Sequence, residues 1–128
     1  MRWMLCAVLV LISQTSLAEN WAKYIQTPDA NRYYDRERLL VMSGTAFIWD
    51  LHDLKSEVSG EAGKNFRSVL YAVEVNCRKE LRRVLSFHRM SGAMGAGQVV
   101  DEHSLVSDWS SPSMESPERQ LMAIACDQ

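Results

Sequence analysis

Three histidines, His52, His88 and His103, are the side chains best suited to acid–base or metal chemistry. Asp50 and Asp101 each precede a histidine by two positions, so on a strand each Asp/His pair would share a face and could ligate zinc. The chain contains no HExxH motif and no paired-cysteine spacing. We therefore interpret the histidines as solvated strand residues, and we predict neither a metal site nor a cofactor.

The sequence also offers no pattern typical of covalent catalysis. No serine lies in a G-x-S-x-G turn. The neighbouring carboxylates of Asp101 and Glu102 would point to opposite faces of a strand and could not act on one substrate atom. We predict that the protein is not an enzyme, and a small hydrolase or metal-binding protein is the weakest alternative.

The first 18 residues predict export. Arg2 is followed by a short apolar run from Met4 to Ile12, and the segment ends in Ser16-Leu17-Ala18, with small residues at the positions that a signal peptidase reads. This pattern is typical of a secretory signal peptide. The run is shorter than the roughly 20 residues of a membrane-spanning helix, although an uncleaved anchor remains an alternative. Cleavage would leave residues 19–128 as one domain with no transmembrane segment, located in the periplasm, at the cell surface or outside the cell.

Two cysteines would remain after cleavage, because Cys6 lies in the signal segment. An even number of cysteines in an exported chain favours a disulfide, here between Cys77 and Cys126. Two free buried thiols are the alternative interpretation. We expect no lipid anchor, because Cys6 follows too short an apolar run to be a lipidation site.

Residues 67–89 predict the central part of the fold, two strands joined by a charged turn. In the first of these strands one face carries a run of apolar side chains, namely Val69, Tyr71, Val73, Val75 and Cys77. Residues 20–26, 31–35, 39–42, 45–55 and 98–100 read as further strands. The fold class is therefore α+β, an antiparallel sheet of about six strands with one C-terminal helix.

The predicted helix covers residues 117–125. Ser116, Pro117 and Glu118 have the residue types of an N-cap, a first helical position and an acidic first turn. Leu121, Met122 and Ala125 would share one face and pack on the sheet. We also expect Trp21, Trp49 and Trp109 to belong to the core, because each lies in or beside an apolar pattern.

A basic cluster follows the first central strand and is the best candidate for a binding surface. It consists of Arg78, Lys79, Arg82 and Arg83. Guanidinium groups can grip sulfate or carboxylate groups in a bidentate way. Glu80 interrupts the cluster, and a merely solvated turn is the alternative. The net charge of −2 gives no reason to expect a nucleic-acid partner.

Several landmarks in order resemble one family of exported bacterial proteins, surface-adhesin protein E. They are Trp21, Tyr33-Tyr34-Asp35, Phe47-Ile48-Trp49, Glu74-Val75-Asn76-Cys77-Arg78, Trp109, Pro112 and Ala125-Cys126. The resemblance implies an antiparallel sheet with a disulfide-tied C-terminal helix, exposure at the bacterial surface and, for the family's named member, binding to host matrix proteins. The chain departs from the family at Asn76, where an aspartate is expected, and in having no lipidation cysteine.

Our functional hypothesis is an exported, non-enzymatic binding module. Its partners would be host extracellular-matrix proteins or components of the envelope, and an exposed sheet edge would also permit a homodimer. The alternative is a periplasmic structural or envelope-associated protein with no host ligand.

Overall fold

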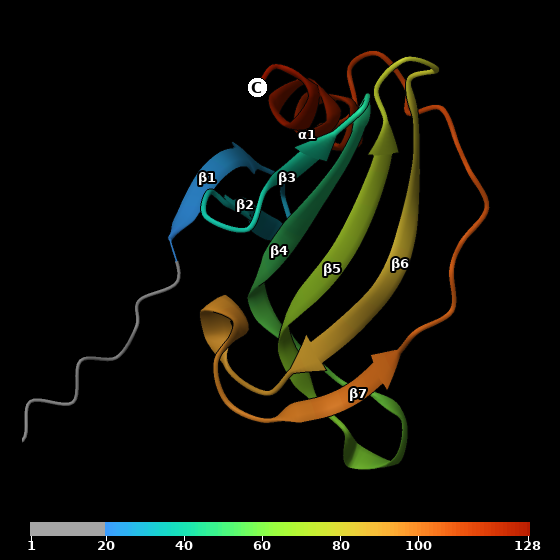
Figure 1. Cartoon of the computed structure of the whole chain (residues 1–128). Helices are drawn as coiled ribbons and strands as arrows, with labels where there is room; N and C mark the ends of the chain where they lie inside the picture. Colours follow the sequence, from blue (N-terminus) through green and yellow to red (C-terminus); the bar gives the residue numbers. More distant parts are fainter. Residues whose placement is uncertain (1–19) are drawn as a thin grey trace, which may run out of the picture.

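The computed structural model describes residues 20–128, so the predicted signal peptide lies outside the described residues. These residues form a single antiparallel sheet of seven strands in the order β1-β2-β4-β5-β6-β7, with β3 paired to β4. One helix, α1, lies across one end of the sheet (Figure 1). The elements are β1 (Trp21–Gln26), β2 (Ala30–Asp35), β3 (Leu40–Met42), β4 (Thr45–Val58), β5 (Phe66–Asn76), β6 (Leu81–Met90), β7 (Val99–His103) and α1 (Pro117–Cys126), with short 3-10 turns η1 (Glu61–Gly63) and η2 (Ala93–Gly95).

This architecture confirms the predicted α+β fold class and its C-terminal helix. The strands differ from the prediction mainly in their ends. β4 continues to Val58, beyond the predicted range 45–55, and β7 begins at Val99 and extends to His103, beyond the predicted range 98–100. Within residues 20–128, no helix has the length and apolar character needed to cross a bilayer.

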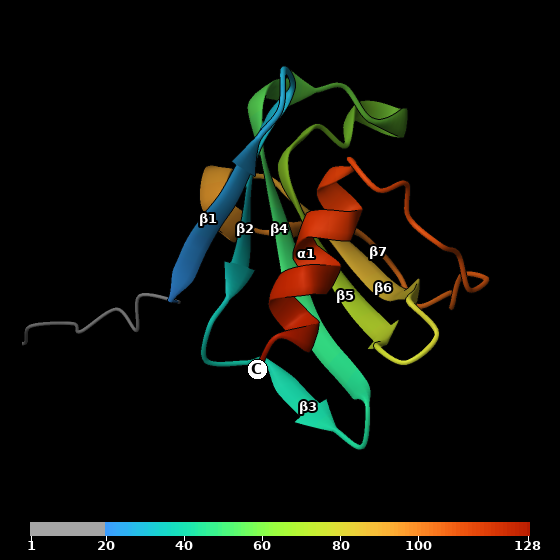
Figure 2. The ribbon, with the colours of Figure 1, turned by 90° about the horizontal axis from the view of Figure 1, so that it is seen from above.

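The hydrophobic core lies between α1 and the central strands β4 and β5. Side chains alternate between the faces of a strand, so Ala46 and Ile48 share the helix side with Val73 and Val75 of the paired strand. Figure 2 shows α1 lying over this side of the sheet. The helix contributes the three residues predicted to face the sheet, Leu121, Met122 and Ala125, and each is at most 4% exposed.

Residues at both ends of α1 hold it in place, and those at its start explain where it begins. The Ser116 hydroxyl accepts a hydrogen bond from the Arg119 backbone N–H at 3.1 Å, and Pro117 occupies the first turn. At the other end, Cys126 forms a disulfide with Cys77, and their Cα atoms are 5.7 Å apart. The predicted disulfide is confirmed, and it ties the end of the helix to the end of β5.

The prediction that the tryptophans belong to the core is wrong. Trp49 is on the face of β4 opposite to α1, where Arg38 stacks 5.2 Å from its ring centre and 5.9 Å from that of Trp21. Trp109 is 38% exposed and lies against Arg83. The helix instead covers the other face of β4, where Ala46 and Ile48 are buried against Leu121, Met122 and Ala125.

The turn after β2 depends on a buried carboxylate, Asp35. It accepts hydrogen bonds from the backbone N–H groups of Glu37 and Arg38 at 2.9 and 3.3 Å, and the Arg38 guanidinium also contacts it. Burial raises the pKa of Asp35, but the hydrogen bonds from Arg38 and Glu37 outweigh it and hold the pKa below its ordinary value. The ionised carboxylate therefore stabilises the folded state.

This lowered pKa predicts a pH-dependent contribution to stability. The contribution is complete above the pKa of Asp35 in the unfolded chain, which is about 4. It is lost as the pH falls through the lower pKa of Asp35 in the folded protein. We expect wild type to exceed Asp35→Asn in unfolding free energy at pH 7, and the difference to shrink as the pH falls below about 4. Urea titrations of both proteins across this range measure the difference. A difference that stays constant with pH would contradict the assigned role of the carboxylate.

Candidate functional site

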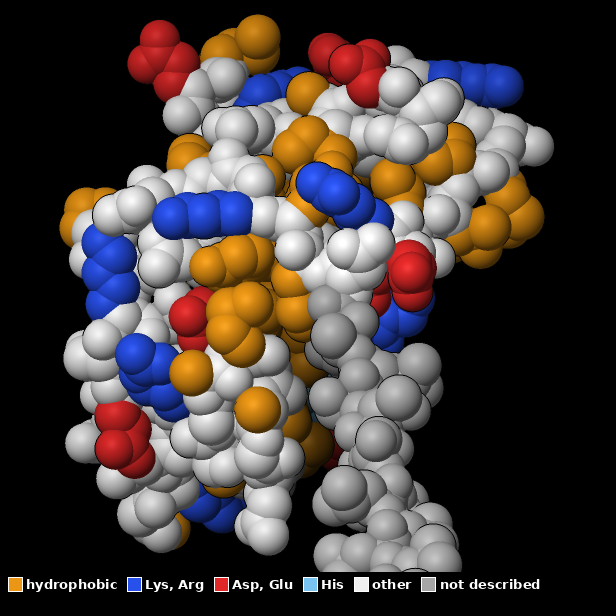
Figure 3. Space-filling view, turned by 90° about the vertical axis from the view of Figure 1, so that its left-hand side faces the viewer, with side chains coloured by type: hydrophobic (Ala, Val, Ile, Leu, Met, Phe, Trp, Pro, Cys, Tyr) orange, Lys and Arg blue, Asp and Glu red, His pale blue; other side chains and the backbone are white. Residues whose placement is uncertain are grey.

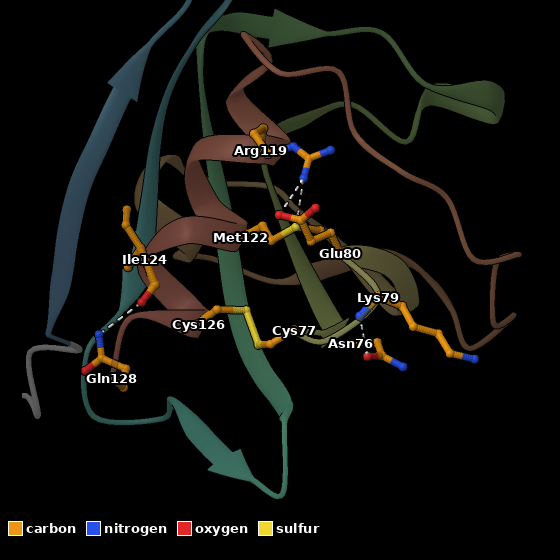
Figure 4. The surroundings of a disulfide bond; sticks show 9 residues. All are labelled: Asn76, Cys77, Lys79, Glu80, Arg119, Met122, Ile124, Cys126 and Gln128. Carbon is orange, nitrogen blue, oxygen red and sulfur yellow. Dashed lines mark hydrogen bonds and ion pairs between the residues drawn. A yellow bond between two sulfur atoms is a disulfide. The ribbon is translucent and has the colours of Figure 1, made fainter.

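The turn between β5 and β6 is the part of the molecule in which the predicted basic cluster begins. The Asn76 side chain accepts a hydrogen bond from the Lys79 backbone N–H at 3.1 Å, and the Cys77 N–H donates to the Gly44 carbonyl at 2.9 Å. The disulfide to Cys126 lies beside these bonds (Figure 4). The turn is therefore held at three points, and its exposed side chains project from a fixed base.

Glu80 interrupts the basic cluster in the sequence but turns away from it in space. Its backbone is left-handed, with φ at 54°, and its carboxylate lies 3.7 Å from the Arg119 guanidinium of α1. Figure 4 shows Glu80 directed toward the helix and the Lys79 side chain directed away from it. Lys79 is thus left without the acidic neighbour that the sequence suggested.

The four predicted binding residues fall into three places. Arg78 and Lys79 are exposed together at the turn. Arg83 lies on the sheet face away from α1, where it bonds Glu74 at 2.8 Å and stacks 4.3 Å from the Trp109 ring centre. Arg82 lies on the helix side, in a small hollow shared with His52. The structure therefore brings Arg78 and Lys79 together and separates Arg82 from Arg83.

Exposed apolar side chains lie at the same end of the sheet. Leu40, Val41 and Met42 of β3 are 50%, 38% and 54% exposed. The turn that follows β3 meets the β5–β6 turn, because the Gly44 carbonyl accepts the Cys77 N–H and a Cβ at Gly44 would lie 2.9 Å from the Arg78 Nε. Figure 3 shows the face on the β1 side of the molecule, where hydrophobic side chains form a strip with Lys and Arg side chains beside it.

The basic residues Arg78 and Lys79 and the apolar residues 40–42 form one surface at this end of the sheet, which we call the tip. Sequence inspection found the basic half of the tip but missed the apolar half, because the short β3 run alone does not reveal that its side chains remain uncovered. Apolar residues next to arginine are a common composition of protein–protein interfaces.

The histidine pairs predicted from the sequence are present as structural contacts. The Asp50 carboxyl is buried and lies 2.9 Å from the His52 Nε2, and it accepts a hydrogen bond from the Tyr24 hydroxyl at 2.7 Å. Burial, and then the nearby Asp50, raise the pKa of Tyr24 well above its ordinary value. These bonds link β1 to β4. Among residues 20–128, no group of three or more His, Cys, Asp or Glu side chains is placed to hold a metal ion.

Comparison with known proteins agrees with this fold. The profile of the family described as surface-adhesin protein E matches residues 21–127. Two solved structures of protein E from Haemophilus influenzae, one of them from a non-typeable strain, are similar in fold. The first has a TM-score of 0.66 at 15% identity, covering 88% of this chain and 79% of that one. The second has a TM-score of 0.64 at 14% identity, covering 84% of this chain and 84% of that one. No curated protein sequence matches the chain.

Proposed function

The chain belongs to the surface-adhesin protein E family, and from this membership we propose that it is an exported, non-enzymatic module that binds host extracellular-matrix proteins through its tip. The single observation that supports placing the binding site at the tip is the exposed pair Arg78 and Lys79. Both are exposed on a turn anchored by the disulfide, while the adjacent Glu80 carboxylate lies toward Arg119.

The tip suits a partner segment that combines acidic and apolar groups. A guanidinium can bind a carboxylate or sulfate in a bidentate way, and an ammonium adds a flexible point charge. Beside them, Leu40, Val41 and Met42 offer apolar area that would leave water on contact. Because the disulfide and the Asn76 side chain fix the turn, little conformational entropy would be lost on binding.

Charge reversal at the tip tests this proposal. We expect the double variant Arg78→Glu/Lys79→Glu to bind immobilised matrix proteins at least about tenfold more weakly than wild type, because two attractive contacts become repulsive. Surface plasmon resonance with the purified, oxidised domain measures the affinity.

The matched control is Lys23→Glu/Lys55→Glu, which changes the net charge equally at two exposed lysines outside the tip. This control should bind as wild type does. Equal weakening in both variants would show a general charge effect and refute the assignment to the tip. Absence of saturable binding by the wild-type domain would favour a periplasmic structural protein with no host ligand.

A further inference from the structure

Four aromatic rings form a ladder across the sheet on its helix side. The ring centres of His52 and Tyr71 are 4.6 Å apart, those of Tyr71 and Phe87 5.9 Å, and those of Phe87 and His103 4.8 Å. The ladder therefore runs over β4, β5, β6 and β7 in turn. Tyr71 also packs against the core, and the ladder extends from there toward β7, away from the tip.

A hollow lies beyond this ladder, away from α1. It has a volume of about 630 Å³, within the range of small-molecule sites. One wall is the β4–β5 connection, residues 58–64, and the other is formed by β6 and β7. In Figure 1 this connection is drawn in green at the end of the sheet opposite to α1. The hollow and the tip are thus at opposite ends of the molecule.

Arg89 and Asp101 form a hydrogen-bonded ion pair in the hollow, next to aromatic rings. The Arg89 guanidinium stacks 5.1 Å from the Phe66 ring centre and 5.0 Å from that of Phe87, and it donates to the Asp101 carboxylate at 2.6 Å. His103 lies 3.3 Å from the same carboxylate. Desolvation raises the pKa of Asp101, but hydrogen bonds from Arg89 and His103 outweigh this effect and hold the pKa below its ordinary value. The Asp101 carboxylate is therefore a hydrogen-bond acceptor at neutral pH.

The hollow thus presents donors and acceptors side by side, next to ring surfaces, with opposite charges that compensate each other. We propose that it binds a saccharide. A sugar hydroxyl both donates and accepts, so adjacent hydroxyls fit the Arg89–Asp101 pair. The apolar C–H face of the sugar would lie against Phe66 or the His103 ring. An acidic peptide fits less well, because Asp101 would repel it.

Neighbouring residues of β7 provide a closely matched test. Asp101 pairs with Arg89 on the hollow side, whereas Glu102, next in sequence, lies on the opposite face near His88. Asp101→Asn and Glu102→Gln each remove one charge with almost no change in shape. We expect Asp101→Asn to weaken saccharide binding by about tenfold or more, the value of a lost charge-assisted hydrogen bond, and Glu102→Gln to bind as wild type.

The measurement is binding of the labelled, oxidised domain to a printed array of mammalian and bacterial glycans, followed by affinity titration of the best glycan. ¹⁵N chemical-shift changes in the wild-type domain, centred on Phe66 and His103, would locate the site without any variant. The proposal is overturned if no glycan binds, if shifts cluster elsewhere, or if soluble polyglutamate displaces the glycan. Arg78→Glu/Lys79→Glu should keep glycan binding, so failure at the tip and failure in the hollow are distinguishable.

Discussion

Replacing Cys77 with serine is expected to lower the free energy of unfolding by about 4 kcal/mol. The disulfide joins residues 49 positions apart, and its loss releases a long loop in the unfolded chain. Because a domain of this size has only about 5–15 kcal/mol of stability in total, the change would be a large fraction. It would also free the base of the turn that holds Arg78 and Lys79, so tip binding should weaken as well.

Urea titration followed by tryptophan fluorescence measures this effect. Cys126→Ser, the double serine variant and reduced wild type should all show the same loss, because each removes the same bond. A loss below about 1 kcal/mol in all of them would show that the bond contributes little beyond the packing of α1 on the sheet.

Leu121→Ala is expected to destabilise the domain by about 3 kcal/mol. Leu121 is 1% exposed and packs in the cluster formed by β4, β5 and α1, so its truncation removes buried area and leaves a cavity. Thermal or urea unfolding measures the change.

The same substitution at an exposed leucine is the control. Leu105 is 83% exposed, and Leu105→Ala should change the unfolding free energy by less than about 0.5 kcal/mol. Similar effects at the two positions would contradict the location of the core between α1 and the sheet.

Local signals predicted the elements that depend on neighbouring residues. The helix start followed from Ser116, Pro117 and Glu118, and the structure shows the corresponding cap. The alternation in residues 69–77 identified the buried side of β5, because a strand's periodicity is visible within one segment. The partner of Cys77 followed from counting cysteines.

Features that depend on how strands align could not be predicted in the same way. The ladder of His52, Tyr71, Phe87 and His103 requires the register of four strands, and a β-bulge between Ala72 and Val73 shifts the β5–β6 register. Nothing in the sequence of β6 or β7 alone indicates that Phe87 and His103 face each other.

The basic cluster shows the same limit at a smaller scale. Arg82 and Arg83 are adjacent in the sequence, but both lie in β6, so their side chains point to opposite faces. Arg78 and Lys79 precede the strand and lie in the turn, where this alternation does not apply. Adjacency in sequence therefore predicted proximity only where the chain is not extended.

The adhesin function is best tested by protease accessibility on intact producing cells, detected with an antibody against residues 20–128 and compared with a periplasmic control protein. We expect protease to remove the protein while the control survives, because an adhesin must face outward. Survival of the protein until the outer membrane is opened would contradict the adhesin function and assign the protein to the periplasm.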